Sequence, residues 1–509
     1  MIRSAVLLLV ATLAAPAVAT AQGEEPLSAI DWLSDVIQPT QDVGGTPPED
    51  EVAKTAGVGS VSVAPIDAPR PDAIGLLPVQ VTGFSPEMWR GSSAGVVAAR
   101  INATRTDLLP AMQEILYRLL LAELDPPADA GPQAVVLLAR IDKLLELGAV
   151  EQAQALTDRL SNPSPEIFRR KFDIALLLHD EETACGTLRQ SPGLSPTFQA
   201  RIYCLARGGE WSAAALSLET GRALGFVSDA QDPLLAQFLE LGLSDDDMPL
   251  EVATRPSPLE FRMYEAIGRP LPTATMPRAF AHTDLHSATG WKNQIEAAER
   301  LAQTGAIDMN RLLGLYQQRK PAASGGVWDR AQAIQTLDGA LLSQSPAILG
   351  TALNIAFEAM RTVELEVPFA RAYCPRLRFR ALDGSSAVLR DIICVLAGEW
   401  DAPPIDQNAI APIVLDAAAL PNFQGTPPKA LQEALIAGFA SLGVPTRLQS
   451  LMSESRQGEA LLRAIEMFSN GANGDLDELS DALIFLRAVG LEKLAQRAAV
   501  ELILLDRRG

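Results

Sequence analysis

The stretch Cys204-Leu-Ala-Arg-Gly-Gly-Glu-Trp211 has a second copy, Cys394-Val-Leu-Ala-Gly-Glu-Trp400, 190 residues further along the chain (394 − 204). Each copy follows another cysteine, Cys185 in the first case and Cys374 in the second, and these four are all the cysteines of the chain. The two intervals are 19 residues (204 − 185) and 20 residues (394 − 374). A two-cysteine unit that recurs in this way predicts a chain built by internal repetition.

The spacing of the cysteines predicts two local disulfides, Cys185–Cys204 and Cys374–Cys394. Residues at equal distances from the turn of an antiparallel helix hairpin lie level with each other. The midpoint of the first pair falls in a turn with proline and glycine, and the midpoint of the second is Gly384. Each bridge would contribute on the order of 3 kcal/mol by constraining the unfolded chain. Free buried thiols and a metal site are the alternatives, although the close Cys-x2-Cys pairing of zinc sites is absent.

Composition predicts an all-α fold. The chain has 509 residues, of which 48% are hydrophobic and only 5% aromatic. Alanine and leucine dominate the apolar residues and favour helices, whereas the β-branched and aromatic residues that favour strands are sparse.

One unit of the chain is a helix, a glycine, a second helix and a proline. Gly148 ends a leucine-rich amphipathic stretch, Ala153 follows five positions later, and Pro165 closes the unit. This pattern resembles the tetratricopeptide repeat (TPR), which has a small residue at the turn and an alanine at the helix crossing. The interval recurs at His179/Ala184, Gly209/Ala214, Gly326/Ala331 and Gly490/Ala495. The resemblance covers residues 130–225 and parts of the chain beyond, and it implies a TPR-like α-solenoid of antiparallel helix pairs.

The order of segments predicts an exported protein. Residues 1–21 have a basic Arg3, an apolar stretch and the small-residue pattern Ala19-Thr20-Ala21, which together are typical of a cleavable signal peptide. Helical repeats are expected in 105–243 and 291–509, the latter ending in C-terminal capping helices. A Pro-rich break is expected in 244–290.

Residues 22–104 are rich in proline, which predicts an extended or disordered tether with a short amphipathic helix at 26–37. Trp32 and Trp89 are large apolar residues in this segment. They are candidates either for docking onto the next domain or for binding a partner protein.

The charge of the chain restricts its partners. There are 62 acidic and 42 basic residues, for a formal net charge of −20. Nucleic acids and anionic membrane surfaces need a basic footprint, so the composition disfavours both. No segment is long and apolar enough to anchor the mature chain in a membrane. We therefore expect a soluble periplasmic protein whose partner is another protein, with a basic surface as one possibility.

The sequence has one candidate metal pair, His282 and His286, which lie four residues apart. On a helix they would share one face, but the usual His-Glu-x-x-His motif is missing, and an incidental surface pair is the simpler interpretation. No motif predicts a cofactor or a catalytic residue.

These patterns favour a non-enzymatic scaffold for protein–protein interaction in the bacterial envelope. An accessory of the flagellar motor or stator, needed for motility, is the first hypothesis. The alternative is an enzyme that acts on peptidoglycan, or a regulator of one, because helical superhelices also occur in cell-wall lytic enzymes.

Overall fold

A computed structural model of the chain describes residues 70–239, 250, 252–411, 414 and 427–505. These residues form helices and two isolated β-bridges, with no strand among them, so the all-α prediction is confirmed for this part of the chain.

The first helices are η1 (Pro71–Ala73), α2 (Val79–Thr82), α3 (Ala94–Ala103), α4 (Pro110–Leu121), α5 (Val135–Glu146), α6 (Val150–Asp158), α7 (Pro165–Leu177), α8 (Glu181–Gln190), η2 (Pro192–Leu194), α9 (Phe198–Arg207), α10 (Trp211–Leu224), α11 (Asp232–Leu239) and α12 (Pro258–Ala266). The rest are η3 (Thr273–Thr275), η4 (Arg278–Phe280), α13 (Ala281–Asp284), α14 (Trp291–Gln303), α15 (Met309–Gln317), α16 (Val327–Ala340), α17 (Pro346–Arg361), α18 (Glu366–Leu377), α19 (Gly384–Ala397), α21 (Lys429–Ala440), α22 (Thr446–Ser453), α23 (Gln457–Ala472), α24 (Leu476–Ala488) and α25 (Glu492–Leu504).

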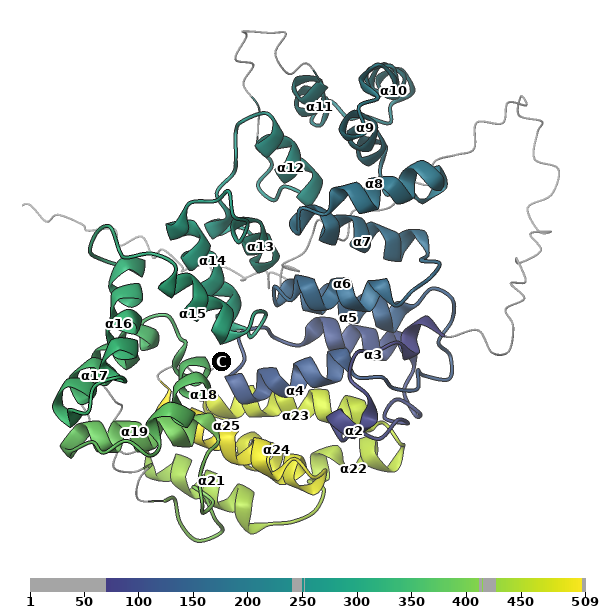
Figure 1. Cartoon of the computed structure of the whole chain (residues 1–509). Helices are drawn as coiled ribbons and strands as arrows, with labels where there is room; N and C mark the ends of the chain where they lie inside the picture. Colours follow the sequence, from purple (N-terminus) through teal and green to yellow (C-terminus); the bar gives the residue numbers. More distant parts are fainter. Residues whose placement is uncertain (1–69, 240–249, 251, 412–413, 415–426, 506–509) are drawn as a thin grey trace, which may run out of the picture.

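Two hydrophobic cores divide the molecule into a body and an arm (Figure 1). The arm comprises α8–α12 and projects from the top of the body, and α7 forms the wall between the two cores. Ile167 and Ile174 of α7 belong to the core of the body, whereas Phe168 and Phe172 belong to the core of the arm. Helix α7 therefore buries two opposite sides, which is why its apolar residues do not form a single stripe.

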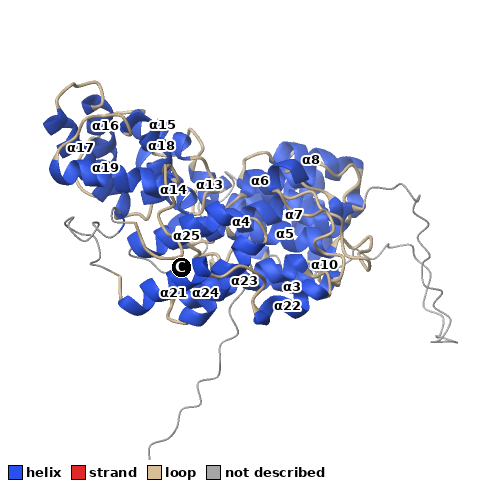
Figure 2. Ribbon diagram, turned by 90° about the horizontal axis from the view of Figure 1, so that it is seen from below, coloured by secondary structure: helices blue, strands red, loops and turns tan. Residues whose placement is uncertain are grey.

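The two ends of the described chain meet inside the body. Helix α25 packs against α4, and α23 packs against both α3 and α4. Figures 1 and 2 show these helices side by side in the middle of the molecule, with α16–α19 at one end and the arm at the other. The expectation that the C-terminal helices cap the far end of a linear array is therefore wrong, because their apolar faces are buried against the first helices.

The glycine–alanine interval marks real turns between helices. Gly148, Gly209 and Gly490 have φ angles of 81°, 84° and 83°. A residue in the left-handed backbone conformation ends one helix and lets the next begin at once. A small side chain five positions later lets the two helices approach closely. The alanines five residues after these turns are all fully buried: Ala153, Ala214 and Ala495.

Ala495 lies in the hairpin that the Gly490/Ala495 interval predicts, since its helix α25 packs against α24. Helix α25 also packs against α4 and α19, so Ala495 belongs to the central core of the body as well.

Other pairs of the series vary the geometry of the turn. His179 adopts φ 59° between α7 and α8, and Ala184 is buried after it. Gly326, with φ 56°, precedes α16 rather than joining two adjacent helices, and Ala331 is buried.

Two further turns of the same kind escaped the sequence pattern. Glu364 has φ 55° between α17 and α18, and Ser455 has φ 58° between α22 and α23. The residues five positions later, Phe369 and Ala460, are fully buried. A search that allowed polar residues at the turn and any apolar residue at the crossing would have found both.

The predicted tether is wrong for residues 70–104, which are folded onto the body. Asp72 is buried and accepts a hydrogen bond from the backbone N of Leu137 at 2.7 Å, so it caps the N-terminus of α5. Pro71 occupies the start of η1, where a missing N–H costs nothing. Trp32 and the predicted helix 26–37 lie outside the described residues.

The Pro-rich break also contains helices. Ser257 and Glu260 form a reciprocal capping box at the start of α12, and Pro258 occupies its first position. The proline density of this segment predicts an interruption, whereas Pro258 begins a helix. The Ser-x-x-Glu pattern was the signal that would have predicted α12.

Candidate functional site

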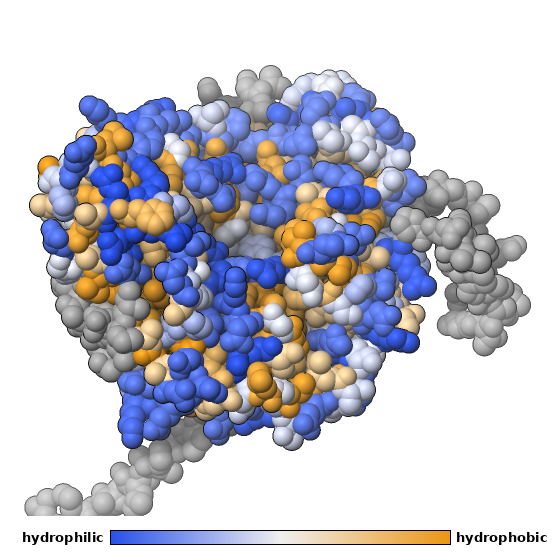
Figure 3. All heavy atoms as spheres, turned by 60° about the horizontal axis from the view of Figure 1, so that its bottom comes forward, coloured by the Kyte–Doolittle hydropathy of each residue, from blue (hydrophilic) through white to orange (hydrophobic). Residues whose placement is uncertain are grey.

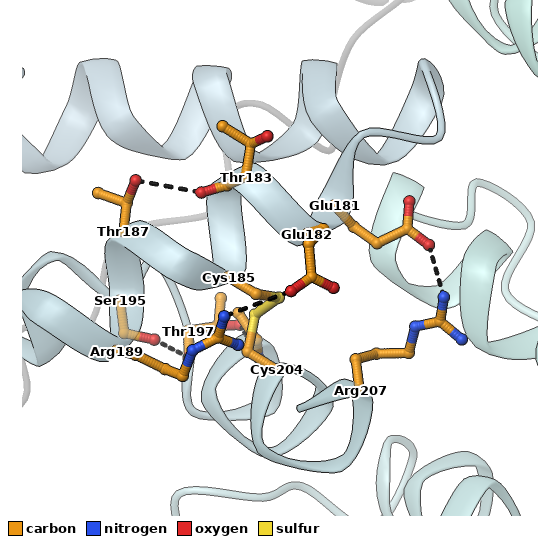
Figure 4. Close-up of a disulfide and its surroundings, with 11 residues drawn as sticks. Glu181, Glu182, Thr183, Cys185, Thr187, Arg189, Ser195, Thr197, Cys204 and Arg207 are labelled. Carbon is orange, nitrogen blue, oxygen red and sulfur yellow. Dashed lines mark hydrogen bonds and ion pairs between the residues drawn. A yellow bond between two sulfur atoms is a disulfide. The ribbon is translucent and has the colours of Figure 1, made fainter. Parts of the chain in front are cut away.

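Two disulfides join neighbouring helices. Cys185 of α8 and Cys204 of α9 have Cα atoms 5.2 Å apart, and Cys374 of α18 and Cys394 of α19 have Cα atoms 5.0 Å apart. Both pairs follow the arrangement that the symmetric spacing predicts. The first bridge lies within the arm (Figure 4) and the second within the body.

Ion pairs fix the arm beside its disulfide. The carboxylate of Glu181, at the start of α8, accepts from Arg207 of α9 at 3.2 Å and from Arg262 of α12 at 3.0 Å. Figure 4 shows the Glu181–Arg207 pair close to the Cys185–Cys204 bridge. Burial alone would raise the pKa of Glu181, but the charge of Arg262 and the bonds around the carboxylate hold that pKa below its usual value. Helices α8, α9 and α12 of the arm are therefore joined by a charged group as well as by apolar packing.

The outer face of α10 is the first candidate surface, and we call it the α10 face. Helix α10 buries only Ala214, Leu218 and Gly221. Leu216 and Leu224 keep 69% and 56% of their surface exposed. Together with Thr220, they recur every four residues and lie along one side of the helix.

The charged side chains of α10 do not interrupt this row. Glu219, three residues after Leu216, borders the row, and its partner Arg222 lies farther round the helix. Arg222 pairs with Glu219 at 2.5 Å and with Asp232 at 2.6 Å. Trp211, at the start of α10, is half exposed and its ring lies 6.3 Å from that of Phe238. The α10 face is therefore an exposed strip of two leucines and a threonine on the arm, bordered by paired charges.

The second candidate is a cleft where the arm meets the body, which we call the junction cleft. Its volume is about 590 Å³, and its walls include the turn between α7 and α8, helix α12, and the segment from η3 to α14. This size lies within the range of small-molecule sites. The charged and aromatic side chains that line it are His179, Phe261, Glu265, Asp284, His286, Glu296 and Arg300.

The histidines are arranged differently from the sequence prediction. His282 is buried and its Nε2 donates to the carbonyl oxygen of Gly148 at 2.7 Å, so it is part of the core. His286 instead stacks on His179, with ring centroids 4.6 Å apart and planes 20° from parallel. The interpretation of His282 and His286 as an incidental surface pair or a metal pair is wrong, because the short helix α13 ends between them and turns the two rings apart.

The electrostatics of the cleft are dominated by carboxylates. Asp284 Oδ2 accepts from the hydroxyl of Thr273, and burial together with the negative charges of Glu265 and Glu296 raises the pKa of Asp284. Arg300 is the cation in the cleft, but its Nη1 and Nη2 donate to the carbonyl oxygens of Thr273 and Met276 at 2.9 Å each. Its hydrogen bonds thus hold the segment at η3 in place.

The sequence-predicted tryptophans have different surroundings. Trp89 is 4% exposed and its ring lies over Gly458 of α23, so the prediction that it binds a partner is wrong and the docking alternative holds. Gly458 leaves room for the indole, and its N–H donates to the carbonyl oxygen of Met88 at 3.0 Å. Trp400, at the end of the second cysteine copy, packs against the core of the body.

The described residues contain no group of three or more His, Cys, Asp or Glu side chains placed to hold a metal ion. Among the same residues, no helix has both the length and the apolar character required to cross a bilayer. No family model, curated protein or solved structure matches this chain.

Proposed function

We propose that this protein is a non-enzymatic scaffold that binds another protein through the α10 face. The observation that carries the proposal is the exposure of Leu216 and Leu224 on a helix of the well-packed, disulfide-bridged arm. Apolar patches also interrupt the polar surface on another side of the molecule (Figure 3). Large apolar side chains grouped on one exposed strip are typical of interaction sites.

The geometry of the α10 face favours a helix as its occupant. Leu216, Thr220 and Leu224 form an i, i+4, i+8 row, and such a row packs into the groove of a neighbouring helix. Within the arm, α10 already packs against α9 and α11. A partner helix on the outer side would continue the arrangement by which the arm itself is built. Burial of each leucine would contribute about 1.5 to 3 kcal/mol.

The charge of the chain favours a partner helix with basic residues beside its apolar face. The formal net charge of −20 disfavours acidic partners at long range and speeds the approach of basic ones. The arm is held by a disulfide and by the Glu181 ion pairs, so little ordering of its backbone is required on binding.

The proposed setting is the periplasm. The signal-like segment 1–21 and the two disulfides both favour export to an oxidising compartment. The TPR-like hairpins favour a role in a multiprotein envelope machine, for which a motility motor remains the first hypothesis.

Photocrosslinking tests this proposal. A photoreactive phenylalanine analogue replaces Thr220 in one form of the protein and Lys493 of α25 in another, and each form is irradiated in cells of the source organism. The expected result is one crosslinked protein from position 220 and none from position 493. The double variant Leu216→Glu/Leu224→Glu should bind the captured protein at least 10-fold more weakly, whereas Leu342→Glu, at another highly exposed leucine, should bind it normally.

Equal crosslinking from both positions, or equal binding by all variants, would show that the partner does not bind at the α10 face. Incubation with cell-wall sacculi separates the scaffold from its rival, since release of soluble muropeptides would favour the peptidoglycan enzyme.

A further inference from the structure

The junction cleft has an excess of negative charge from three different helices. Glu265 comes from α12, Asp284 from α13 and Glu296 from α14. Glu265 also pairs with Arg262 and Glu296 with Lys292 at 3.5 Å, in both cases on their own helix near the rim. Asp284 lies deeper and accepts its hydrogen bond from the neutral hydroxyl of Thr273. A positive group placed beside Asp284 would therefore offset the mutual repulsion of the carboxylates.

The resident cation, Arg300, offsets this repulsion only in part, because its charge lowers the pKa of Asp284 but burial and the neighbouring carboxylates outweigh it. Both terminal nitrogens of Arg300 donate to backbone carbonyl oxygens, which anchor residues 273 and 276. Arg262 is shared between Glu181 and Glu265. The guanidinium groups near the cleft thus have structural partners, whereas the cavity itself remains open.

The stacked imidazoles add an aromatic wall with acceptor capacity. Within the described part of the chain, the buried Nε2 of His179 has no hydrogen-bond partner. Burial, followed by the charge of Arg262, lowers the pKa of His179, which favours the neutral form of its ring. A neutral imidazole can accept a hydrogen bond on one nitrogen, and a ring face attracts cations.

We propose that the junction cleft binds an alkylammonium group, which enters between the Asp284 carboxylate and the His179–His286 stack. An alkylammonium combines one positive charge with three N–H donors, and its alkyl chain suits the apolar part of the wall around Phe261. A free diamine and the lysine side chain of a bound protein share this chemistry. The junction cleft is separate from the α10 face, so this proposal does not depend on the proposed scaffold function.

Calorimetric titration of the full chain tests the proposal with four probes: 1,4-diaminobutane, a capped Gly-Lys-Gly peptide, 1,4-butanediol and magnesium chloride. The expected result is saturable binding of the diamine or the peptide, and none of the diol or of magnesium. Tighter binding of the diamine would indicate a free amine as the natural ligand, and tighter binding of the peptide would indicate a lysine side chain.

Variants locate the binding site. Asp284→Asn should weaken binding at least 10-fold, and Glu296→Gln, at an exposed position that tolerates substitution, should weaken it about 3-fold. Asp229→Asn removes the same charge from an exposed residue of the arm outside the cleft and should have no effect. Equal losses in all three variants would reveal binding to the general negative field and would overturn the proposal, as would binding of the diol.

The three histidines supply a second readout that does not depend on folding of a variant. The ring signals of His179 and His286 in NMR spectra should shift on titration with the bound amine, whereas the signal of the buried His282 should stay unchanged. Binding without any shift at His179 and His286 would place the amine elsewhere. The variant Leu216→Glu/Leu224→Glu should keep full amine binding, which separates failure of this site from failure of the α10 face.

Discussion

The carboxylate of Glu114 in α4 accepts hydrogen bonds from both terminal nitrogens of Arg497 in α25, at 2.7 and 2.8 Å, across 383 residues of sequence. Arg371 of α18 donates to the same carboxylate at 2.9 Å and Arg118 donates at 2.5 Å. One partly buried acid thus joins the first, middle and last helical blocks of the body. Bidentate arginine–carboxylate pairs are among the stronger polar contacts in proteins.

We expect Glu114→Gln to lower the free energy of unfolding by about 3 kcal/mol, because it leaves three arginines without their shared partner. Chemical denaturation at pH 7 measures the loss. Glu87→Gln is the matched control, since the Glu87–Arg90 pair is highly exposed and its removal should change stability by less than about 0.5 kcal/mol. Equal effects in the two variants would contradict the role given to Glu114.

Stability should also fall as the pH is lowered, through two groups with different pKa values. Burial would raise the pKa of Glu114, but its arginine partners outweigh that effect and lower the pKa to about 2, so its contribution is present above pH 4.5 and is lost between pH 4.5 and 2. Burial lowers the pKa of His282 to about 4. As the pH falls, the unfolded chain therefore binds a proton at this histidine before the folded chain does, and the free energy of unfolding decreases by about 3 kcal/mol between pH 6.5 and 4.

Unfolding free energies measured from pH 8 to pH 3 check the histidine range, with His282→Gln as the variant. The glutamine amide can keep a donor towards Gly148 but binds no proton, so the slope between pH 6.5 and 4 should decrease. An unchanged slope would show that His282 titrates normally in the folded protein.

The two disulfides should protect different parts of the molecule. Each closes a loop of about 20 residues and should stabilise the fold by about 3 kcal/mol. Cys185→Ser/Cys204→Ser should speed hydrogen exchange in α8–α10, and Cys374→Ser/Cys394→Ser should speed it in α18 and α19. Thiol labelling of the denatured protein should find no free cysteine before reduction and four after it. Four labelled thiols without reductant would contradict both bridges.

The contact of Trp89 with Gly458 predicts opposite results for two glycine substitutions. A Cβ atom on Gly458 would lie 2.1 Å from the Trp89 ring, so Gly458→Ala should destabilise the protein by about 1 to 3 kcal/mol. Gly314 lies in α15 with open space at its Cβ position, so Gly314→Ala should stabilise it by about 0.5 to 1 kcal/mol. Thermal unfolding of both variants checks the signs.

Local features of this fold were predictable from the sequence, whereas contacts between distant segments were not. The cysteine spacing and the Gly148/Ala153 interval lie within single hairpins, where helix geometry relates residue separation directly to position. The packing of Trp89 on Gly458 depends on how the first and last blocks meet, and no periodicity in the sequence contains that information. Proline density was misleading because both prolines start helices. Pro71 starts η1, which Asp72 joins to the N-terminus of α5, and Pro258 starts α12, which Ser257 caps.

The candidate sites show the same limit. The pairing of His282 with His286 assumed one continuous helix, but α13 ends at Asp284 and His286 meets His179, which is 107 residues earlier (286 − 179). The sequence did mark His179 as unusual, because this histidine replaces the glycine of an otherwise regular interval and adopts a left-handed backbone conformation at the turn. The exposed row on α10 could have been found from Leu216 and Leu224, but only the structure shows that nothing in the described chain covers them.

The meeting of α4 with α25 has a consequence for biosynthesis. The N-terminus of α4 is capped by Glu501, which accepts from the backbone N of Ala111 at 2.7 Å and lies 390 residues downstream. At translation rates of 5 to 20 residues per second, roughly 20 to 80 s pass before that carboxylate exists. During this interval α4 can pack against α5 but not against α23 or α25, so the core of the body closes only after the last helices have been made.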